Sequence, residues 1–222
     1  MMQRRTFFVF DLDGTIIDSR RDLAESANDM LETYGAGPLS IEAVTGMVGE
    51  GARVLVERAL RTRGLDPAEP EALARFLASY DRRLLVHTRP YDGLPDVIRD
   101  AARRGVVAVL TNKPEAPARR ILDAFALSGS IAWVVGGDSG FARKPDPSAL
   151  VDLVARAETT AAKTMMVGDS PVDAETARRA GVTFCAALYG FGRATGGDVA
   201  VASAAELDAV IRTFTMAASA QG

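Results

Sequence analysis

Five short apolar runs, separated by helical patterns, constrain the fold of this chain more than any other feature of its sequence. Nearly every residue in each run is apolar, which is typical of strands that helices cover on both faces of a parallel sheet. The runs span residues 6–10, 106–110, 131–135, 164–167 and 183–187. This alternation predicts an α/β fold, with a doubly wound parallel sheet as its Rossmann-like core.

Helical patterns lie between and after the later runs. They span residues 94–104, 116–125, 147–156, 171–180 and 204–214. Gly105 and Gly181 directly follow two of them. Because a left-handed residue after a helix costs glycine little, we expect both to end their helices in that conformation. The small, polar residues after Met216 predict a frayed end.

About seventy residues interrupt the alternation after the first run. Residues 19–89 contain no strand-like run, and apolar side chains recur there at helical spacing. The last of these stripes is Leu73, Phe76, Leu77, Tyr80 and Leu84. Because the insertion is too long for a loop, the sequence predicts a helical domain at 19–89 within a core of residues 1–18 and 90–222.

Charge and composition favour a small-molecule partner. The 26 basic and 29 acidic side chains give a net charge of −3, which provides no general attraction for nucleic acid or acidic lipid. The apolar run after the basic start is shorter than the roughly 7–15 residues of a signal-peptide core, and no run approaches the roughly 20 residues of a membrane span. Cys185 is the single cysteine, and its apolar neighbours predict a buried, inert thiol. We expect a cytoplasmic monomer or homodimer with no nucleic acid or membrane partner.

Polar side chains follow three of the five runs, and another lies in a loop between two runs. In open α/β sheets, ligands bind beyond the carboxyl ends of the strands, so these residues are the candidates for chemistry. They are Asp11-Leu12-Asp13-Gly14-Thr15, Thr111-Asn112-Lys113, Lys144 in the loop after the third run, and Gly168-Asp169-Ser170-Pro171-Val172-Asp173.

The carboxylates among these residues predict a cation site. Asp11 and Asp13 point to the same side of an extended chain, and Asp169 and Asp173 share one face at the start of a helix. Two carboxylates about 4 Å apart repel by about 4 kcal/mol at an effective dielectric constant near 20, so a cluster of four needs a cation. Oxygen ligands without a nearby His or Cys favour Mg²⁺ over Zn²⁺.

The remaining polar groups suit a phosphoryl group. The Thr111 hydroxyl, the Asn112 amide and the Lys144 ammonium can all donate hydrogen bonds to an anion. A carboxylate in line with phosphorus can act as a nucleophile and form an aspartyl-phosphate. A second carboxylate can protonate the departing oxygen and later activate water.

These motifs, in this order, resemble those of the haloacid dehalogenase-like hydrolase superfamily, and the resemblance covers nearly the whole chain. It implies that residues 19–89 are a helical cap, that Asp11 is the nucleophile and that Asp13 is the general acid and base. It also implies that Thr111, Asn112 and Lys144 hold the phosphate, with Lys144 taking part in catalysis. The implied Mg²⁺ ligands are Asp11, the backbone carbonyl of Asp13, and Asp169, supported by Gly168, Ser170 and Asp173.

Three softer stretches look like those of phosphoglycolate phosphatases: residues 48–60, 110–114 and 188–192. The implied reaction is hydrolysis of a small phosphomonoester, with 2-phosphoglycolate giving glycolate. Within 48–60, the loop containing Gly49 and Gly51 could present backbone N–H groups to a substrate anion, and Arg53 could pair with a carboxylate or phosphate. A tight turn and a surface arginine are the alternative interpretations.

The three lysines and the single histidine need separate interpretations. An ammonium is a compact charge that arginine does not simply replace, which favours a function for Lys144. Lys163 is interpreted as a surface charge, and the role of Lys113 is undecided. His87 has no identifiable Ser or Cys partner, which favours a structural role.

Other functions fit the sequence less well. A haloacid dehalogenase has no need of Asp13, and a phosphonate hydrolase of this superfamily uses a cap lysine, which is absent between Asp18 and Arg89. A sugar-phosphate phosphatase or phosphomutase keeps all four motifs and stays open, although the superfamily's mutases resemble a form with a cap lysine near a histidine. The non-enzymatic alternative is a phosphate-sensing, receiver-like protein; such domains are about half this length and lack the insertion.

Overall fold

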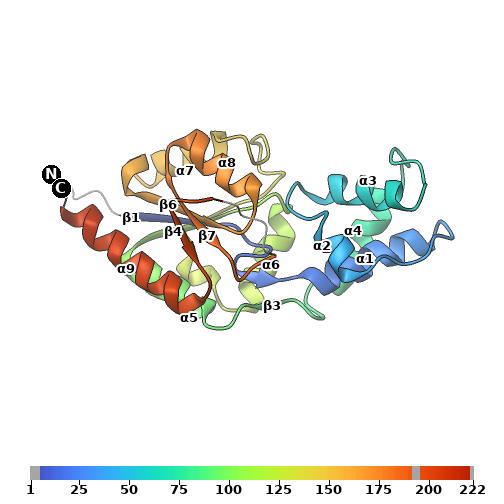
Figure 1. Ribbon diagram of the computed structural model, residues 1–222, viewed down its shortest axis with the longest axis horizontal. Coiled ribbons are helices and arrows are strands. Elements are labelled where there is room, and N and C mark those ends of the chain that lie inside the picture. Colours follow the sequence, from blue (N-terminus) through green and yellow to red (C-terminus); the bar gives the residue numbers. More distant parts are fainter. Residues whose placement is uncertain (1–5, 192–195, 221–222) are drawn as a thin grey trace. The chain divides into compact units, whose positions relative to one another are not determined.

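The structure, a computed structural model, describes residues 6–191 and 196–220. The remaining residues of the predicted core, including Gly192 of the 188–192 stretch, lie outside the described residues. The chain divides into a sheet unit, Met1–Ile17 with Pro90–Gly222, and a helical unit, Asp18–Arg89. Where the chain passes between them, β2 (Ile17–Asp18) and β3 (Arg89–Pro90) pair as a two-stranded sheet (Figure 1).

Within the described residues, the sheet unit contains one six-stranded sheet with the order β5-β4-β1-β6-β7-β8. Its neighbouring strands pair in parallel. The strands are β1 (Thr6–Phe10), β4 (Gly105–Leu110), β5 (Trp133–Val135), β6 (Thr164–Gly168), β7 (Thr183–Ala187) and β8 (Val199–Val201). Because β1 lies between β4 and β6, it is buried along its whole length.

Helices cover both faces of this sheet. On one face α5 (Leu94–Arg104) packs against α9 (Ala204–Ala220), and on the other α7 (Ser148–Arg156) packs against α8 (Pro171–Ala180) (Figure 1). The helix α6 (Glu115–Ala124) packs against β5. The chain also forms short 3₁₀ turns at Ser128–Ser130 and Ala161–Lys163.

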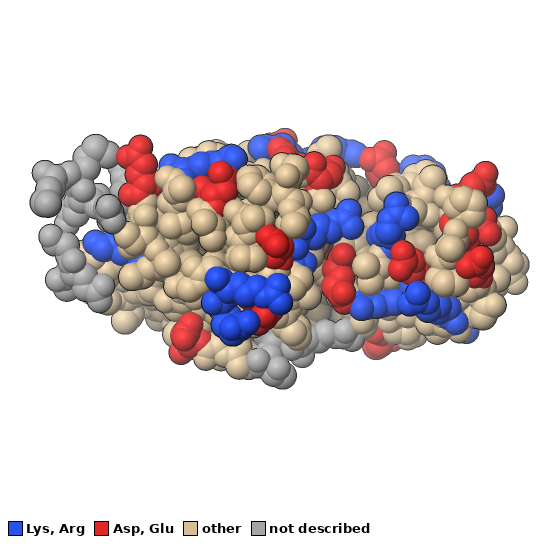
Figure 2. Space-filling view, turned by 90° about the horizontal axis from the view of Figure 1, so that it is seen from above, with Lys and Arg blue, Asp and Glu red and all other residues tan. Residues whose placement is uncertain are grey.

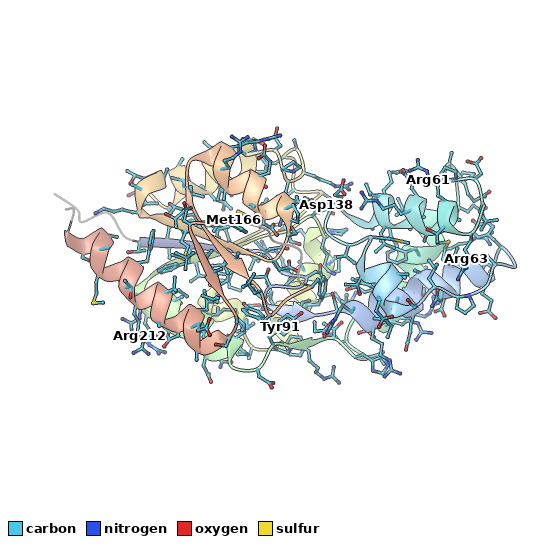
Figure 3. All side chains as sticks on the ribbon, viewed as in Figure 1. Arg61, Arg63, Tyr91, Asp138, Met166 and Arg212 are labelled. Atoms are coloured by element: carbon cyan, nitrogen blue, oxygen red, sulfur yellow. The ribbon has the colours of Figure 1, made fainter. Side chains whose placement is uncertain are left out.

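Successive side chains of β1 pack alternately on the two faces of the sheet. The Phe7 ring meets the Trp133 ring edge-on at 6.1 Å, whereas the Phe8 ring lies 6.3 Å from Phe214 of α9. Met166 of the neighbouring β6 is fully buried in the core on the Phe7 side, and Arg212 extends from α9 (Figure 3). Packing on both faces of the sheet buries the apolar run of β1 and fixes the register of this strand.

The helical unit contains four helices within its described residues. They are α1 (Arg20–Glu32), α2 (Ile41–Thr45), α3 (Ala52–Thr62) and α4 (Ala72–Arg83). Phe76 and Tyr80 of α4 are buried and their rings stack 5.9 Å apart. The predicted stripe is wrong at Leu77, which is 37% exposed, because it lies to one side of the face that carries Phe76 and Tyr80.

Three local predictions in the sheet unit are wrong. Gly105 has an extended backbone (φ −164°) and begins β4 instead of a left-handed cap. It is needed there because a Cβ would lie 2.2 Å from the Thr6 carbonyl oxygen. The end of α9 does not fray after Met216 but continues to Ala220, with Ala218 buried. Lys163 is only 8% exposed, since the chain enters the buried strand β6 at the next residue. Gly181 does take the predicted left-handed conformation, with φ +67°.

Charged side chains of both signs are interspersed on the face drawn in Figure 2. Many pair within one helical turn, such as Arg99 with Asp96 at 2.9 Å. Exposed pairs of this kind contribute little stability individually. None of the helices in the described part of the chain combines the length and apolar character needed to span a bilayer.

Candidate active site

The predicted site residues follow strands that lie side by side in the sheet. The backbone ladder continues one residue past each of two strands: the Asp11 N–H donates to the Val167 carbonyl at 2.9 Å, and the Thr111 N–H donates to the Val135 carbonyl at 2.9 Å. The carboxyl ends of β1, β4 and β6 therefore bring Asp11, Thr111 and Asp169 to one edge of the sheet.

Lys144 links two of the carboxylates at this edge. Its ammonium nitrogen lies 2.8 Å from Asp11 Oδ1 and 2.5 Å from Asp173 Oδ1. The side chains of Lys144 and Asp173 are at most 2% exposed, and that of Asp11 is 10% exposed. The structure thus brings together three residues that are far apart in the sequence, in a setting from which water is largely excluded.

Asp173 is positioned by the start of α8. Its Oδ2 accepts hydrogen bonds from the Ser170 N–H (3.2 Å) and hydroxyl (2.5 Å), while the Ser170 Oγ accepts from the Asp173 N–H. This reciprocal arrangement is a capping box. Gly168 leaves room for it, because a Cβ at that position would lie 2.4 Å from the Asp173 Cβ. Ser170 and Gly168 therefore both serve the placement of Asp173.

Asp169 lies against the loop that follows β1. Its Oδ2 accepts from the Phe191 N–H at 2.9 Å, and its Oδ1 accepts from the Thr15 hydroxyl at 3.4 Å. Gly14 has φ +86°, and a Cβ there would lie 2.2 Å from Asp169 Oδ2. Gly190 packs equally closely, with a Cβ that would lie 2.0 Å from the Gly14 carbonyl oxygen.

The Asn112 amide binds the backbone of Lys144 in both directions. The amide nitrogen donates to the Lys144 carbonyl at 3.0 Å, and Asn112 Oδ1 accepts from the Lys144 N–H at 3.0 Å. Asn112 is thereby a positioning residue for Lys144, and the predicted contact of its side chain with phosphate stays a prediction. Thr111 is 2% exposed, and its Oγ1 accepts from the Lys113 N–H at 3.2 Å.

Asp13 pairs with a different lysine. The Lys113 ammonium lies 2.8 Å from Asp13 Oδ1, with side chains 5% and 12% exposed. The sequence left Lys113 without a role. The structure places it inside the candidate site, beside the second carboxylate of the Asp-x-Asp motif.

Burial raises the pKa values of two carboxyl groups here. The pKa of Asp11 rises to about 7, because burial and the charges of Asp173 and Asp13 together outweigh the attraction of Lys144. Burial and the charges of Asp11 and Asp173 raise the pKa of Asp169 to about 8. Burial opposes the charge of Lys144, but Asp11 and Asp173 raise the pKa of its ammonium above the usual value. The buried carboxylates are therefore only partly neutralised by the chain itself.

Asp11, Asp169 and Asp173 form a candidate cation site. Each offers a carboxylate oxygen, and these oxygens lie within 4.8 Å of one another. An all-oxygen donor set with incomplete charge compensation fits a hard divalent cation such as Mg²⁺. Asp173 belongs to this group by position, whereas the family resemblance implied only a supporting role for it. A metal contact of Asp13 through its carbonyl stays a prediction.

A second acidic group lies in the helical unit, where Asp22 and Glu25 approach His87. Its members already have partners. Asp22 accepts from the N–H groups of His87 and Thr88, and Glu25 accepts from Arg21 and Arg83. The Asp22 carboxylate thus fixes the loop that follows α4, and the backbone of His87 in this loop has a structural role.

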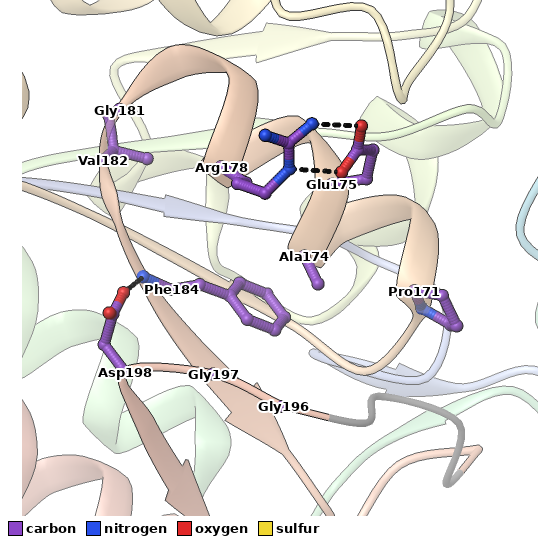
Figure 4. Close-up of a pocket in the computed structure, with 10 residues that line it drawn as sticks. All are labelled: Pro171, Ala174, Glu175, Arg178, Gly181, Val182, Phe184, Gly196, Gly197 and Asp198. Carbon is purple, nitrogen blue, oxygen red and sulfur yellow. Dashed lines mark hydrogen bonds and ion pairs between the residues drawn. The ribbon is translucent and has the colours of Figure 1, made fainter.

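Other polar groups lie away from the strand-end cluster. A pocket of about 460 Å³ lies along α8 and β7 (Figure 4), but Glu175 in its lining pairs with Arg178 and Asp198 accepts from the Phe184 N–H. None of the clustered carboxylates lines it.

The predicted specificity residues belong to the helical unit. Gly49 and Gly51 both have positive φ, +120° and +95°, as a turn before α3 requires, and Arg53 is exposed on the first turn of that helix. Their part in substrate choice stays a prediction. No individual role was predicted for Gly14, Thr15 or Gly190, although the first two belong to the motif after the first apolar run and the third belongs to the 188–192 stretch.

A sequence profile of the haloacid dehalogenase-like hydrolases matches residues 8–187, a range that includes all the clustered carboxylates and both lysines described above. The chain belongs to this family. As a haloacid dehalogenase-like hydrolase, it has the predicted α/β core, and its helical insertion between β1 and β4 is the cap of that fold.

Several relatives of this haloacid dehalogenase-like hydrolase carry a narrower name. The phosphoglycolate phosphatase of Rhodospirillum rubrum is 42% identical over 193 residues, which cover 83% of this chain and 80% of that protein. The phosphoglycolate phosphatase of Pseudomonas putida is 40% identical over 190 residues, covering 82% and 69%. The crystal structure of a "predicted phosphoglycolate phosphatase" from Haemophilus somnus matches with a TM-score of 0.87 at 27% identity, covering 95% and 99%.

Proposed function

We propose that this hydrolase is a Mg²⁺-dependent phosphoglycolate phosphatase, which converts 2-phosphoglycolate and water to glycolate and phosphate. The observation that carries the chemistry is the Lys144 ammonium held between Asp11 and Asp173 at the carboxyl ends of the strands. The relatives named phosphoglycolate phosphatase, at about 40% identity over most of the chain, support the substrate.

Asp11 is the proposed nucleophile. Lys144 holds its Oδ1, which leaves the other carboxylate oxygen to attack phosphorus. A bond forms between that oxygen and phosphorus as the bond from phosphorus to the glycolate oxygen breaks, giving an aspartyl-phosphate. Asp13, two residues on, donates a proton to the departing oxygen.

The second step reverses the role of Asp13. Its carboxylate takes a proton from the water that attacks the aspartyl-phosphate, and the phosphorus–oxygen bond to Asp11 breaks. Phosphate leaves and the Asp11 carboxylate is restored. Lys144, together with the Thr111 hydroxyl, is proposed to donate hydrogen bonds to the phosphoryl oxygens through both steps.

Asp11 and Asp169, with the Asp13 carbonyl and Asp173 in support, are the proposed residues that would hold Mg²⁺. Bound there, Mg²⁺ would neutralise charge on the phosphoryl oxygens and orient them. Burial and neighbouring carboxylates raise the pKa values of Asp11 and Asp169, so these two groups would gain most from its charge.

The helical cap is the proposed source of further substrate selection, through Gly49, Gly51 and Arg53. The exposed Arg53 side chain can pair with an anionic group by charge-assisted hydrogen bonds. We also propose a cytoplasmic location and a monomeric or homodimeric state.

The decisive experiment measures phosphate release from 2-phosphoglycolate and from a panel of sugar phosphates, with and without Mg²⁺. We expect Mg²⁺-dependent release with 2-phosphoglycolate as the best substrate. The Asp11→Asn variant should be inactive, and acid quenching of the wild-type reaction should trap a phosphorylated chain. Release from no ester would refute the phosphatase, and an active Asp11→Asn variant would refute the covalent mechanism.

A further inference from the structure

Lys113 is a buried cation that the proposed reaction does not use. Its ammonium lies 2.8 Å from Asp13 Oδ1, and the lysine side chain is 5% exposed. Burying an ion pair costs free energy that the attraction between its charges often fails to recover, so such pairs contribute little to stability. The position of Lys113 next to the proposed acid and base points instead to the substrate.

The backbone of Lys113 is fixed on both sides. Its N–H donates to Thr111 Oγ1 at 3.2 Å, and its carbonyl accepts from the Gly137 N–H at 2.9 Å. Gly136 packs so closely that a Cβ there would lie 2.8 Å from the Lys113 carbonyl oxygen. The lysine therefore extends from a rigid support rather than from a free loop, which is the condition for a precise binding residue.

The two lysines of the site serve different carboxylates. Lys144 contacts Asp11, whose carboxylate is proposed to attack phosphorus. Lys113 contacts Asp13, which is proposed to protonate the oxygen that departs with glycolate. Lys144 thus lies at the phosphoryl end of the reaction, and Lys113 lies at the leaving-group end.

The leaving group in the proposed reaction is itself an anion. In 2-phosphoglycolate a single methylene group separates the departing oxygen from the carboxylate. A group that touches Asp13 is therefore within reach of that carboxylate while Asp13 contacts the departing oxygen. An ammonium has three donors and can hold two carboxylates at once.

We propose that Lys113 binds the substrate carboxylate and selects phosphate esters that carry a carboxylate next to the ester carbon. This proposal rests on the proposed phosphatase function and names the residue in the sheet unit that recognises the leaving group. Hydrogen bonds between an ammonium and a carboxylate are short and strong. A site built around such a pair discriminates against a substrate that lacks the carboxylate.

The kinetic test compares two substrates and two variants. The substrates are 2-phosphoglycolate and 2-hydroxyethyl phosphate, in which an alcohol replaces the carboxylate. The variants are Lys113→Met and the control Lys163→Met. Over the whole residue, backbone included, Lys113 and Lys163 are both 8% exposed, but Lys163 precedes β6 at the opposite end of the strand from the site.

Lys113→Met is expected to lower kcat/KM for 2-phosphoglycolate about 10- to 100-fold more than for 2-hydroxyethyl phosphate, the range for loss of one charge-assisted hydrogen bond. Lys113→Arg should recover part of the difference. Lys163→Met should leave the ratio between the two substrates unchanged. An equal loss on both substrates would overturn the proposal, because Lys113 would then act only through Asp13.

A binding measurement on the wild-type enzyme needs no variant to fold. The two ligands are 3-phosphonopropionate, which has a methylene in place of the departing oxygen, and 3-hydroxypropylphosphonate, which lacks the carboxylate. We expect 3-phosphonopropionate to inhibit hydrolysis of p-nitrophenyl phosphate at least about 10-fold more tightly. Equal inhibition by the two would refute carboxylate recognition.

Failure of the proposed function gives a different pattern. If the wild-type chain hydrolysed neither substrate nor p-nitrophenyl phosphate, the phosphatase itself would be refuted. If it hydrolysed p-nitrophenyl phosphate and both esters with no preference for 2-phosphoglycolate, the phosphatase would stand and the role of Lys113 would be refuted.

Discussion

The Lys144 ammonium and the Asp173 carboxylate lie 2.5 Å apart, with side chains 2% and 0% exposed. Their elements meet because Asn112 binds the Lys144 backbone and Ser170 binds the Asp173 side chain. A buried pair of this kind is costly to break, since either partner alone would be an uncompensated charge. Asp173 also offsets part of the positive charge of Lys144, which would otherwise attract Asp11 more strongly.

Replacing Asp173 with asparagine tests this relationship. We expect Asp173→Asn to lower the free energy of unfolding by about 3 kcal/mol, because the buried ammonium loses one of its two carboxylates. We also expect kcat to fall about 100-fold as Lys144 shifts toward Asp11. Chemical denaturation and steady-state kinetics measure the two effects.

Glu175→Gln on the same helix is the matched control. Glu175 pairs with Arg178 and Arg179 on the surface, where solvent screens the interaction. The control should retain both stability and activity. If both variants retained the same stability and activity, the buried pair would contribute no more than the surface pairs of Glu175.

The central strands could be predicted from sequence almost to the residue, because helices cover both faces and nearly every side chain is apolar. β1 and β7 match the predicted runs at both ends. The edge strand β8 escaped prediction, since its apolar run is short, at residues 199–202, and only Val201 of its three strand residues is buried. Pairing at a sheet edge depends on the neighbouring strand more than on local composition.

The site residues that directly follow a strand could be predicted from the sequence. Asp11, Thr111 and Asp169 each end or follow an apolar run, so the sheet alone places them. The pairing of Lys113 with Asp13 spans 100 residues and depends on how two loops approach each other. No local pattern specifies that approach, and the sequence consequently left Lys113 undecided.

Removing a proposed metal ligand should weaken Mg²⁺ binding directly. We expect Asp169→Asn to bind Mg²⁺ at least about 10-fold more weakly than the wild-type chain by isothermal titration calorimetry. Chelation with EDTA should abolish phosphate release, and added Mg²⁺ should restore it. Asp96→Asn, at a carboxylate 87% exposed, should bind Mg²⁺ as the wild type does. Equal affinity in both variants would remove Asp169 from the metal site.

Asp22 holds the end of the helical unit together. Its carboxylate accepts from the His87 N–H at 2.9 Å, the Thr88 N–H at 2.7 Å and the Thr88 hydroxyl at 2.7 Å, and Asp22 is fully buried. In Asp22→Asn an amide nitrogen would face these donors, and we expect the free energy of unfolding to fall by about 3 kcal/mol. Urea denaturation measures the change.

Asp66→Asn provides the comparison for Asp22. Asp66 is exposed and accepts from the Ala68 N–H at 2.9 Å. Its replacement should change the free energy of unfolding by no more than about 0.5 kcal/mol. A similarly small effect at Asp22 would show that the hydrogen bonds from its three donors contribute no more than surface ones.

The Cys185 thiol should resist alkylation in the native state. Burial raises its pKa to about 12, so the thiolate is a minute fraction of the population at pH 8. The unfolded chain, with an ordinary thiol pKa, releases the proton more readily, so this group contributes stability below pH 9 that is lost as pH rises toward 12. Reaction with a thiol reagent should require denaturant, and prompt modification of the native protein at pH 8 would contradict the burial.

Gly14→Ala should disable the site through a single methyl group. Its Cβ would lie 2.2 Å from Asp169 Oδ2. Asp169 would have to move away from its partners Thr15 and Phe191, and with it one side of the proposed metal site. We expect kcat/KM to fall at least about 100-fold, since displacements of about 1 Å at a reacting centre have effects of that size.

Gly35→Ala separates this clash from backbone strain. Gly35 also has positive φ, +69°, but a Cβ there has no neighbour within 4 Å. Both variants should lose about 1 kcal/mol of stability, because an L-residue disfavours the left-handed region. Only Gly14→Ala should lose activity and Mg²⁺ affinity. If Gly35→Ala lost as much activity, strain rather than contact with Asp169 would explain the need for glycine at position 14.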